Sequence, residues 1–282
     1  MGHNSIRYNL TKQEIISDIK MTLAADFKNR MSVIVVEGLD DVDFFRGKTA
    51  EEVYIYESFS GKTGVKEITE FFDSHKVIGI CDRDYDMAES CKNIFYYDFS
   101  CMEMMVISND NAFKAFTDQI YQGELSHIEL REKILYDIHW ISCFRKLNAL
   151  ENWCIRLSGI SIAKAYNNIR KCLELDKIIS QINDANKNWL DENREILALI
   201  SKEMKKPSDT LNLYDITQGH DFINCLHCNC NAAKKCTRKT LGVDAFSAAL
   251  RVAYRTTDFI ETTLYNNLLT YQITYKLHVL SK

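Results

Sequence analysis

The stretch MSVIVVEGLDDVDFF, residues 31–45, decides the fold of the first part of the chain. It opens with a continuous β-branched run at residues 33–36, which is typical of a strand buried on both faces of a parallel sheet. Glu37 and Gly38 end this run, and a helix is expected to begin with Asp40 and Asp41. A buried strand that ends in carboxylates predicts an α/β sheet with polar chemistry at its carboxyl edge.

A second stretch, HKVIGICDRDYD at residues 75–86, has the same design. Its apolar run ends in Asp82, Arg83 and Asp84, and the two-residue alternation of a strand would point Asp82 and Asp84 the same way. If the two strands are neighbours, about 4.8 Å apart, Glu37 can join this pair. Three carboxylates so close need a cation between them, and their hard oxygens suit Mg²⁺ or Mn²⁺. The sequence therefore predicts a metal site.

These residues carry a resemblance to a known family. The motif EGLDD, with Glu37, Gly38 and Asp41, and the later motif DRD, with Asp82 and Asp84, resemble the Toprim domain of topoisomerases, primases and OLD-family nucleases. The motifs cover roughly residues 31–108. The chain is most similar to the small stand-alone Toprim proteins that accompany an ABC-type ATPase in anti-phage systems, the AriB-type nucleases of PARIS. The motif GHDF near residue 219 is also similar to that group.

The resemblance implies a fold, an activity and further site residues. It implies a Toprim-type parallel sheet flanked by helices and a magnesium-dependent nuclease in which Asp41 and Glu103 complete the metal shell. Glu103 is preferred for this place over Asp98 and Asp86, and a solvent-facing glutamate is the alternative. Lys62, in GKTGV, and His220, in GHDF, would meet substrate phosphate. A solvent-exposed lysine at a helix start explains Lys62 equally well, and a packed histidine is the alternative for His220.

The resemblance also implies partners. It implies a toxic effector that an AriA-like ABC-type ATPase keeps inactive, that forms a homodimer when released, and that cleaves nucleic acid, with transfer RNA as the expected target. A non-catalytic Toprim-fold subunit that regulates or binds within an ATPase complex is the alternative.

Composition limits where and how the chain works. No apolar run reaches the ~20 residues that span a bilayer, and the N-terminus lacks a signal-peptide core, so we expect a soluble cytoplasmic protein without membrane contact. Its ten cysteines are then expected to be reduced thiols. A net charge of −4 argues against a surface that binds nucleic acid everywhere. Any binding would use a local patch. Candidate patches contain Lys234, Lys235, Arg238 and Lys239, or Arg145 and Lys146.

The chain is expected to divide near residue 109. Residues 1–109 would form the α/β Toprim domain, with an N-terminal helix over residues 11–29 that begins at a capping box of Thr11 and Glu14. Residues 110–282 would form a helical domain. The helical spacing of its apolar residues is clearest over residues 110–122, 129–157, 163–182 and 186–204.

A cluster of cysteines in the second half has two interpretations. Cys225, Cys228, Cys230 and Cys236, with His220 and His227 nearby, contain the C-x2-C spacing of a zinc knuckle. The segment from Phe222 onward, however, has the pattern of one continuous helix, on which these cysteines would be ordinary packing residues. A structural zinc site normally takes ligands from two elements, which favours packing.

Overall fold

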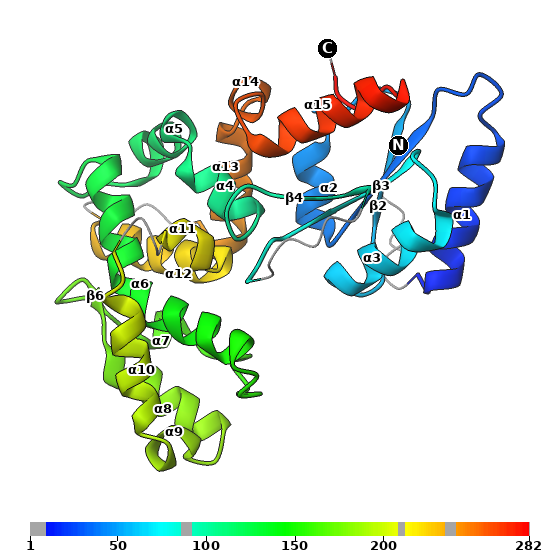
Figure 1. Cartoon of the computed structure of the whole chain (residues 1–282). Coiled ribbons are helices and arrows are strands. Elements are labelled where there is room, and N and C mark those ends of the chain that lie inside the picture. Colours follow the sequence, from blue (N-terminus) through cyan, green and yellow to red (C-terminus); the bar gives the residue numbers. More distant parts are fainter. Residues whose placement is uncertain (1–9, 86–91, 208–211, 235–240, 282) are drawn as a thin grey trace. The chain divides into compact units, whose positions relative to one another are not determined.

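A computed structural model describes residues 10–85, 92–207, 212–234 and 241–281. The chain forms two compact units (Figure 1). The first unit joins the segment up to Asp98 with the segment from Thr256 to the C-terminus, and the second unit comprises Phe99–Arg255.

The first unit is built on a four-stranded sheet of order β2-β1-β3-β4, in which all neighbouring strands are parallel. The strands are β1 Ser32–Val36, β2 Val53–Glu57, β3 Val77–Cys81 and β4 Ile94–Tyr96. Every residue of β1 and β3 is buried, as the continuous apolar runs predicted for central parallel strands. The coarse prediction of an α/β unit with a parallel sheet is therefore confirmed.

Helices cover both faces of this sheet. They are α1 Lys12–Ala24, α2 Leu39–Phe45, α3 Gly61–Phe72, α14 Thr256–Phe259 and α15 Thr263–Tyr275. Helix α1 begins at the predicted capping box. Ile15 of α1 and Ile68 of α3 pack in one core cluster with Val33 and Val35 of β1. Since strand side chains alternate, Ile34 faces the opposite side of the sheet.

An aromatic cluster brings the C-terminal segment back to the first unit. Phe259 of α14 packs edge-on against Phe44 and Phe45 of α2, with ring centroids 5.6 and 6.0 Å apart. A β-bridge between Thr49 and Leu280 adds a backbone connection. The predicted division, a helical domain over residues 110–282, thus differs from the structure, because α14 and α15 bury their apolar side chains in the first unit.

The second unit is mainly helical, as predicted, and also begins earlier than residue 110. Its helices are α4 Met102–Ser108, α5 Asp110–Ile120, α6 His127–Leu150, α7 Ile162–Ala165, α8 Leu175–Ala185, α9 Trp189–Glu192, α10 Glu195–Met204, α11 Leu213–Ile216, α12 Gly219–Ala232 and α13 Val243–Ala253. Helix α6, whose residues Ile134, Ile138 and Ile141 are buried, packs against α5, α10, α11 and α12. No helix in the described ranges combines the length and apolar composition needed to cross a membrane.

The predicted helix over residues 163–182 is wrong in its first half. A short hairpin of β5 Tyr166–Asn167 and β6 Cys172–Leu173 interrupts it. The Asn167 side chain accepts hydrogen bonds from the backbone N–H groups of Ile169 and Arg170, both at 3.0 Å. Such a local side-chain bond competes with helix formation, and here it stabilises a turn.

The start of α15 gives a test of how the C-terminal segment is held. The Asp98 carboxylate accepts hydrogen bonds from the backbone N–H groups of Thr263 at 2.8 Å and Leu264 at 2.9 Å. Asp98 therefore satisfies two donors at the N-terminus of the helix, and Asp98→Ala is expected to lower the free energy of unfolding by about 1–2 kcal/mol. Urea unfolding of the full chain measures this change.

Asp118→Ala is the matched control, since the Asp118 carboxylate pairs with Lys114 on an exposed helix surface. It should change the free energy of unfolding by less than about 1 kcal/mol. Equal effects of the two substitutions would contradict the capping role of Asp98.

Candidate active site

The carboxyl ends of β1 and β3 lie side by side at the point where the sheet order reverses. From β1 the chain moves to β2 on one side, and β3 then pairs with the other side of β1. Crevices at such switch points are the usual ligand sites of open α/β sheets. The strands are therefore the neighbours that the metal-site prediction required, with Val36 paired to Ile80 just before the acidic residues.

Glu37 ties three elements together at this point. Its Oε1 accepts a hydrogen bond of 2.8 Å from the backbone N–H of Asp82, which follows β3. It also accepts a hydrogen bond from the backbone N–H of Lys62, in the first turn of α3. Gly61 precedes Lys62 with a φ of 50°, a left-handed value that favours glycine, and a Cβ there would lie 3.5 Å from Glu37 Oε2. That distance is an ordinary contact, so the left-handed backbone, and not a lack of space, favours glycine at this position.

The environment of Glu37 disfavours its negative charge. Burial raises the pKa of the Glu37 carboxyl above its usual range, and the nearby charge of Asp84 raises it further. The hydrogen bonds from the Asp82 and Lys62 amides and the charge of Lys62 oppose this rise without cancelling it. A cation bound beside Glu37 would stabilise the ionised carboxylate that this environment disfavours.

Lys62 holds the DRD segment. Its Nζ donates to the carbonyl oxygen of Arg83 at 3.1 Å and lies 3.3 Å from Asp84 Oδ2, while it also lies 5.6 Å from the ring centroid of Tyr96. The alternation that was expected to align Asp82 with Asp84 does not apply, because β3 ends at Cys81 and Asp84 has a left-handed φ of 51°. Lys62, rather than strand geometry, positions Asp84.

Asp41 is engaged in the turn that carries Glu37. Its Oδ2 accepts a hydrogen bond of 3.0 Å from the backbone N–H of Gly38, and its Oδ1 accepts one of 2.6 Å from the hydroxyl of Tyr97. Both carboxylate oxygens therefore connect α2, the β1 end and the segment after β4. Asp41 positions the Glu37–Gly38 turn, and its place in a metal shell stays a prediction.

Sequence analysis did not single out the carboxylate that ends the neighbouring strand. Glu57 is the last residue of β2 and pairs in register with Val36. Burial raises the pKa of the Glu57 carboxyl. The signal was present, since VYIYE repeats the pattern of an apolar run that ends in a carboxylate.

The donor set fits a hard divalent cation in its chemistry. Glu37, Asp82 and Asp84 offer carboxylate oxygens, which Mg²⁺ and Mn²⁺ prefer, and no thiolate or imidazole. Within the described part of the chain, however, no three His, Cys, Asp or Glu side chains are arranged so that they could hold one metal ion together. Lys62 neutralises Asp84 in this arrangement. Asp86, an alternative ligand, lies outside the described residues.

Glu103 and His220 lie together in the second unit, whereas the carboxylates of the DRD segment lie in the first. Glu103 is in the first turn of α4, and Gly219 begins α12 directly beside it. A Cβ at Gly219 would lie 2.6 Å from Glu103 Oε2, so only glycine allows this approach. Glu103 therefore contacts Gly219, the residue before His220, where α4 packs against α12.

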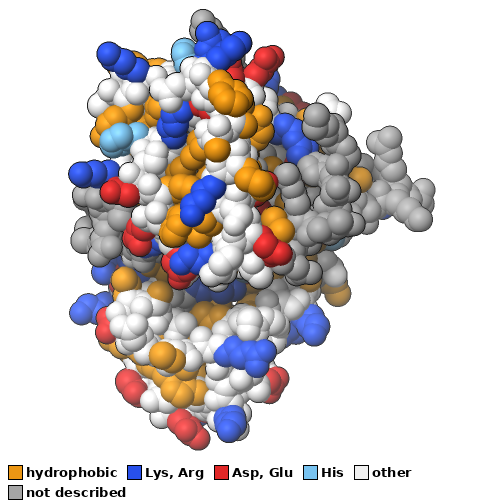
Figure 2. Space-filling model, turned by 90° about the vertical axis from the view of Figure 1, so that its right-hand side faces the viewer, with side chains coloured by type: hydrophobic (Ala, Val, Ile, Leu, Met, Phe, Trp, Pro, Cys, Tyr) orange, Lys and Arg blue, Asp and Glu red, His pale blue; other side chains and the backbone are white. Residues whose placement is uncertain are grey.

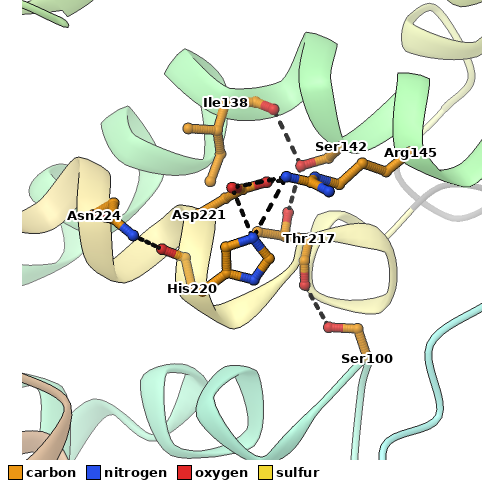
Figure 3. Close-up of polar contacts among 8 residues, drawn as sticks. All are labelled: Ser100, Ile138, Ser142, Arg145, Thr217, His220, Asp221 and Asn224. Carbon is orange, nitrogen blue, oxygen red and sulfur yellow. Dashed lines mark hydrogen bonds and ion pairs between the residues drawn. The ribbon is translucent and has the colours of Figure 1, made fainter. Parts of the chain in front are cut away.

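A buried ion pair orients His220 (Figure 3). Arg145 donates to Asp221 through Nε at 2.7 Å and Nη2 at 3.2 Å, and His220 Nε2 lies 3.2 Å from Asp221 Oδ1. Burial alone would raise the pKa of Asp221, but the hydrogen bond from His220 and the charge of Arg145 hold this pKa below its usual value. The imidazole itself is exposed. Asp221 therefore serves as the fixed partner that sets the orientation of the ring.

Of the two candidate nucleic-acid patches, one consists of residues that form ion pairs within the chain, and most of the other lies outside the described residues. Arg145 is held by Asp221, and Lys146 Nζ lies 2.7 Å from Glu203 Oε1, so both belong to largely buried ion pairs. Lys235, Arg238 and Lys239 of the other patch lie outside the described residues. Among the described side chains on the face shown in Figure 2, basic and acidic groups are interspersed. This distribution agrees with the net charge of −4.

The cysteine cluster has the packing expected of one helix. Cys225, Cys228 and Cys230 are all buried within α12. Burial raises the pKa of the Cys230 thiol to about 12 and that of Cys225 well above its usual value, which disfavours the thiolates that zinc requires. Cys236 lies outside the described residues. The described geometry favours the packing interpretation over a zinc knuckle.

Comparison with models of known protein families and with curated proteins gives no match for this chain.

The raised pKa of Glu37 leads to a stability prediction. As pH rises past the unfolded pKa of about 4.3, Glu37 ionises first in the unfolded state, so its ionisation lowers the free energy of unfolding until the folded pKa is passed. Glu37→Gln removes this charge and keeps a carbonyl that can accept the Asp82 N–H. The variant should therefore gain stability relative to wild type as pH rises from about 4 to about 7. Urea unfolding at several pH values measures the difference.

The matched control is Glu70→Gln, an exposed residue on α3. Its stability difference from wild type should change little with pH. If the free energy of unfolding of Glu37→Gln, relative to wild type, stayed constant or fell with rising pH, ionisation of Glu37 would not destabilise the folded state.

Proposed function

We propose that this chain is a metal-dependent phosphodiesterase that cleaves nucleic acid. The observation that carries the proposal is the position of Glu37, a carboxylate with a raised pKa at the switch point of the sheet, bonded directly to the backbone of the DRD segment. Acidic groups with raised pKa values cluster at functional sites.

Glu37, Asp82 and Asp84 would hold one or two Mg²⁺ or Mn²⁺ ions. Such ions polarise a phosphoryl oxygen and lower the pKa of a bound water. Among the chain's own residues, Asp41 fixes the turn that carries Glu37, and Lys62 fixes the position of Asp84. Lys62 also supplies positive charge at the edge where a substrate phosphate would approach.

Substrate and partners follow from the resemblance and not from the fold, which supports many functions. In this proposal the chain is the AriB-like effector of an anti-phage system, an ABC-type ATPase holds it inactive, and the released effector acts in the cytoplasm as a homodimer on transfer RNA. Glu103 and His220 keep their roles as a further metal ligand and a phosphate contact within this proposal.

A second candidate is a non-catalytic subunit that regulates or binds within an ATPase complex. The ion pair between Lys62 and Asp84 favours it, because that pair neutralises a carboxylate that a metal would otherwise use. The arrangement of the described carboxylates, in which no three converge on one point, also favours it.

Cleavage of mixed nucleic acids separates the two candidates. Purified chain is incubated with transfer RNA, other RNA and DNA, in Mg²⁺ or Mn²⁺ and in excess chelator. The nuclease proposal expects cleavage only with metal, and Glu37→Gln and Asp82→Asn should each lower the rate by about 100-fold or more, which is at least the effect of losing an outer-shell partner of a metal site. Gel analysis of end-labelled substrates gives the rates.

Glu70→Gln again serves as the matched control and should cleave like wild type. Cleavage that persists in chelator, or that survives Glu37→Gln, would overturn the metal site. An absence of cleavage on every substrate would favour the non-catalytic subunit.

A further inference from the structure

We propose that Arg83 is a phosphate-binding residue of this site and that its guanidinium contacts a backbone phosphate of the nucleic acid. This inference rests on the proposed function and deepens it. Sequence analysis treated Arg83 only as the spacer between Asp82 and Asp84.

The Arg83 side chain has an unused hydrogen-bond donor. Its Nε is buried without a hydrogen-bond partner among the described residues. Leaving a buried donor unsatisfied is unfavourable, and such groups in native structures call for an explanation, such as a functional role or a bound water or ion. The described carboxylates also form no ion pair with the Arg83 guanidinium, although Asp82 and Asp84 flank it in sequence. Asp84 forms its ion pair with Lys62.

The backbone around Arg83 is held from two sides. The peptide N–H of Asp82 donates to Glu37 Oε1 at 2.8 Å, and the carbonyl oxygen of Arg83 accepts from Lys62 Nζ at 3.1 Å. The left-handed conformation of Asp84 then turns the chain away. The backbone that carries Arg83 is therefore fixed at the carboxyl edge of the sheet, so ligand binding by its side chain would cost little backbone freedom.

The chemistry of guanidinium selects the ligand class. Its planar fork of donors matches the oxygens of a phosphate, and it stays charged at every physiological pH. A phosphodiester that approaches Glu37, Asp82 and Asp84 is repelled by their negative charge, so its binding needs positive charge from the protein as well as from any metal. Since Lys62 is paired with Asp84, Arg83 is the cation of this segment that the described carboxylates leave available.

The test measures binding separately from cleavage. Fluorescence anisotropy follows a short labelled RNA hairpin and a DNA oligonucleotide of the same sequence in chelator, at salt concentrations from ~50 to ~200 mM. Arg83→Gln should weaken binding about 10-fold or more for both probes and reduce the slope of log affinity against log salt by about 1. Arg83→Lys should keep most of the salt dependence of the affinity, because the positive charge remains. It should lose part of the affinity, because lysine lacks the planar donor fork of the guanidinium.

Arg30→Gln is the matched control, an exposed arginine of the same unit that precedes β1 and so lies near the amino end of the sheet. It should bind like wild type. A thermal unfolding curve gives a second readout: Arg83→Gln should unfold at the wild-type temperature or above, since it removes an unsatisfied buried donor, whereas a structural arginine would lower that temperature.

Three outcomes are distinguishable. If wild type cleaves with metal but Arg83→Gln keeps the wild-type affinity and salt slope, this inference is overturned and the proposed function stands. If wild type neither binds nor cleaves any probe, both are overturned. If Arg83→Gln weakens binding of the labelled probes and reduces the salt dependence, while its unfolding temperature does not fall, the inference is supported even where no cleavage occurs.

Discussion

The hydrogen bond from the Asp82 amide to Glu37 Oε1 is the interaction on which the candidate site depends. It joins the ends of two parallel strands that are adjacent in the sheet but 45 residues apart in the chain. A second amide, that of Lys62, brings the start of α3 to the same carboxylate. The edge of the sheet is thus closed around a single partly buried glutamate. Parallel strands alone would leave their end loops free to diverge, so the carboxylate gives this edge its shape.

This arrangement disfavours ionisation of the carboxyl groups at the strand ends, chiefly through burial. Burial and the charge of Asp84 both oppose ionisation of Glu37, and burial likewise raises the pKa of Glu57 at the next strand end. A glutamine at position 37 would keep an acceptor for the Asp82 N–H without the cost of burying a charge, so stability does not explain the choice of glutamate. Proteins commonly accept such local destabilisation where a site must bind or react. A positively charged ligand at this edge would offset the unfavourable burial of the Glu37 charge.

The sequence predicts the central strands well because their signal is local. A run of β-branched residues specifies burial on both faces, and the ends of parallel strands must share one edge, so the proximity of Glu37 to the DRD segment follows from residues 31–45 and 75–86. The alignment of Asp84 does not follow, since it depends on a left-handed turn and on a lysine from another helix. The bond between Asp41 and Tyr97 joins residues 56 apart. No local pattern marks such a partner.

The C-terminal segment, which packs in the first unit, also could not be placed from local sequence patterns. Asp98 holds the start of α15 across 165 residues of sequence, and Phe259 packs against Phe44 and Phe45, which precede residue 98. The apolar periodicity of the last helices indicates that they pack, but not what they pack against. The boundary predicted near residue 109 therefore marks the point in the sequence where predicted strands give way to predicted helices. The structure instead divides the chain by buried contacts.

The two cations near the DRD segment differ in ways that suit different tasks. An ammonium is a compact charge with three donors, and Lys62 uses it to bond a carbonyl and a carboxylate at once, which stabilises this edge of the sheet. A guanidinium in that place would bind the carboxylate with two parallel bonds, and such a pair would be harder for a metal to displace. Lys62 pairs with Asp84, and a metal could displace this single-bonded lysine more easily than a two-bonded arginine. Arg83, which has no described carboxylate partner, would then be available for the phosphate. Both features favour a site that binds a cation and an anion together, as a metal-dependent reaction on a phosphodiester requires.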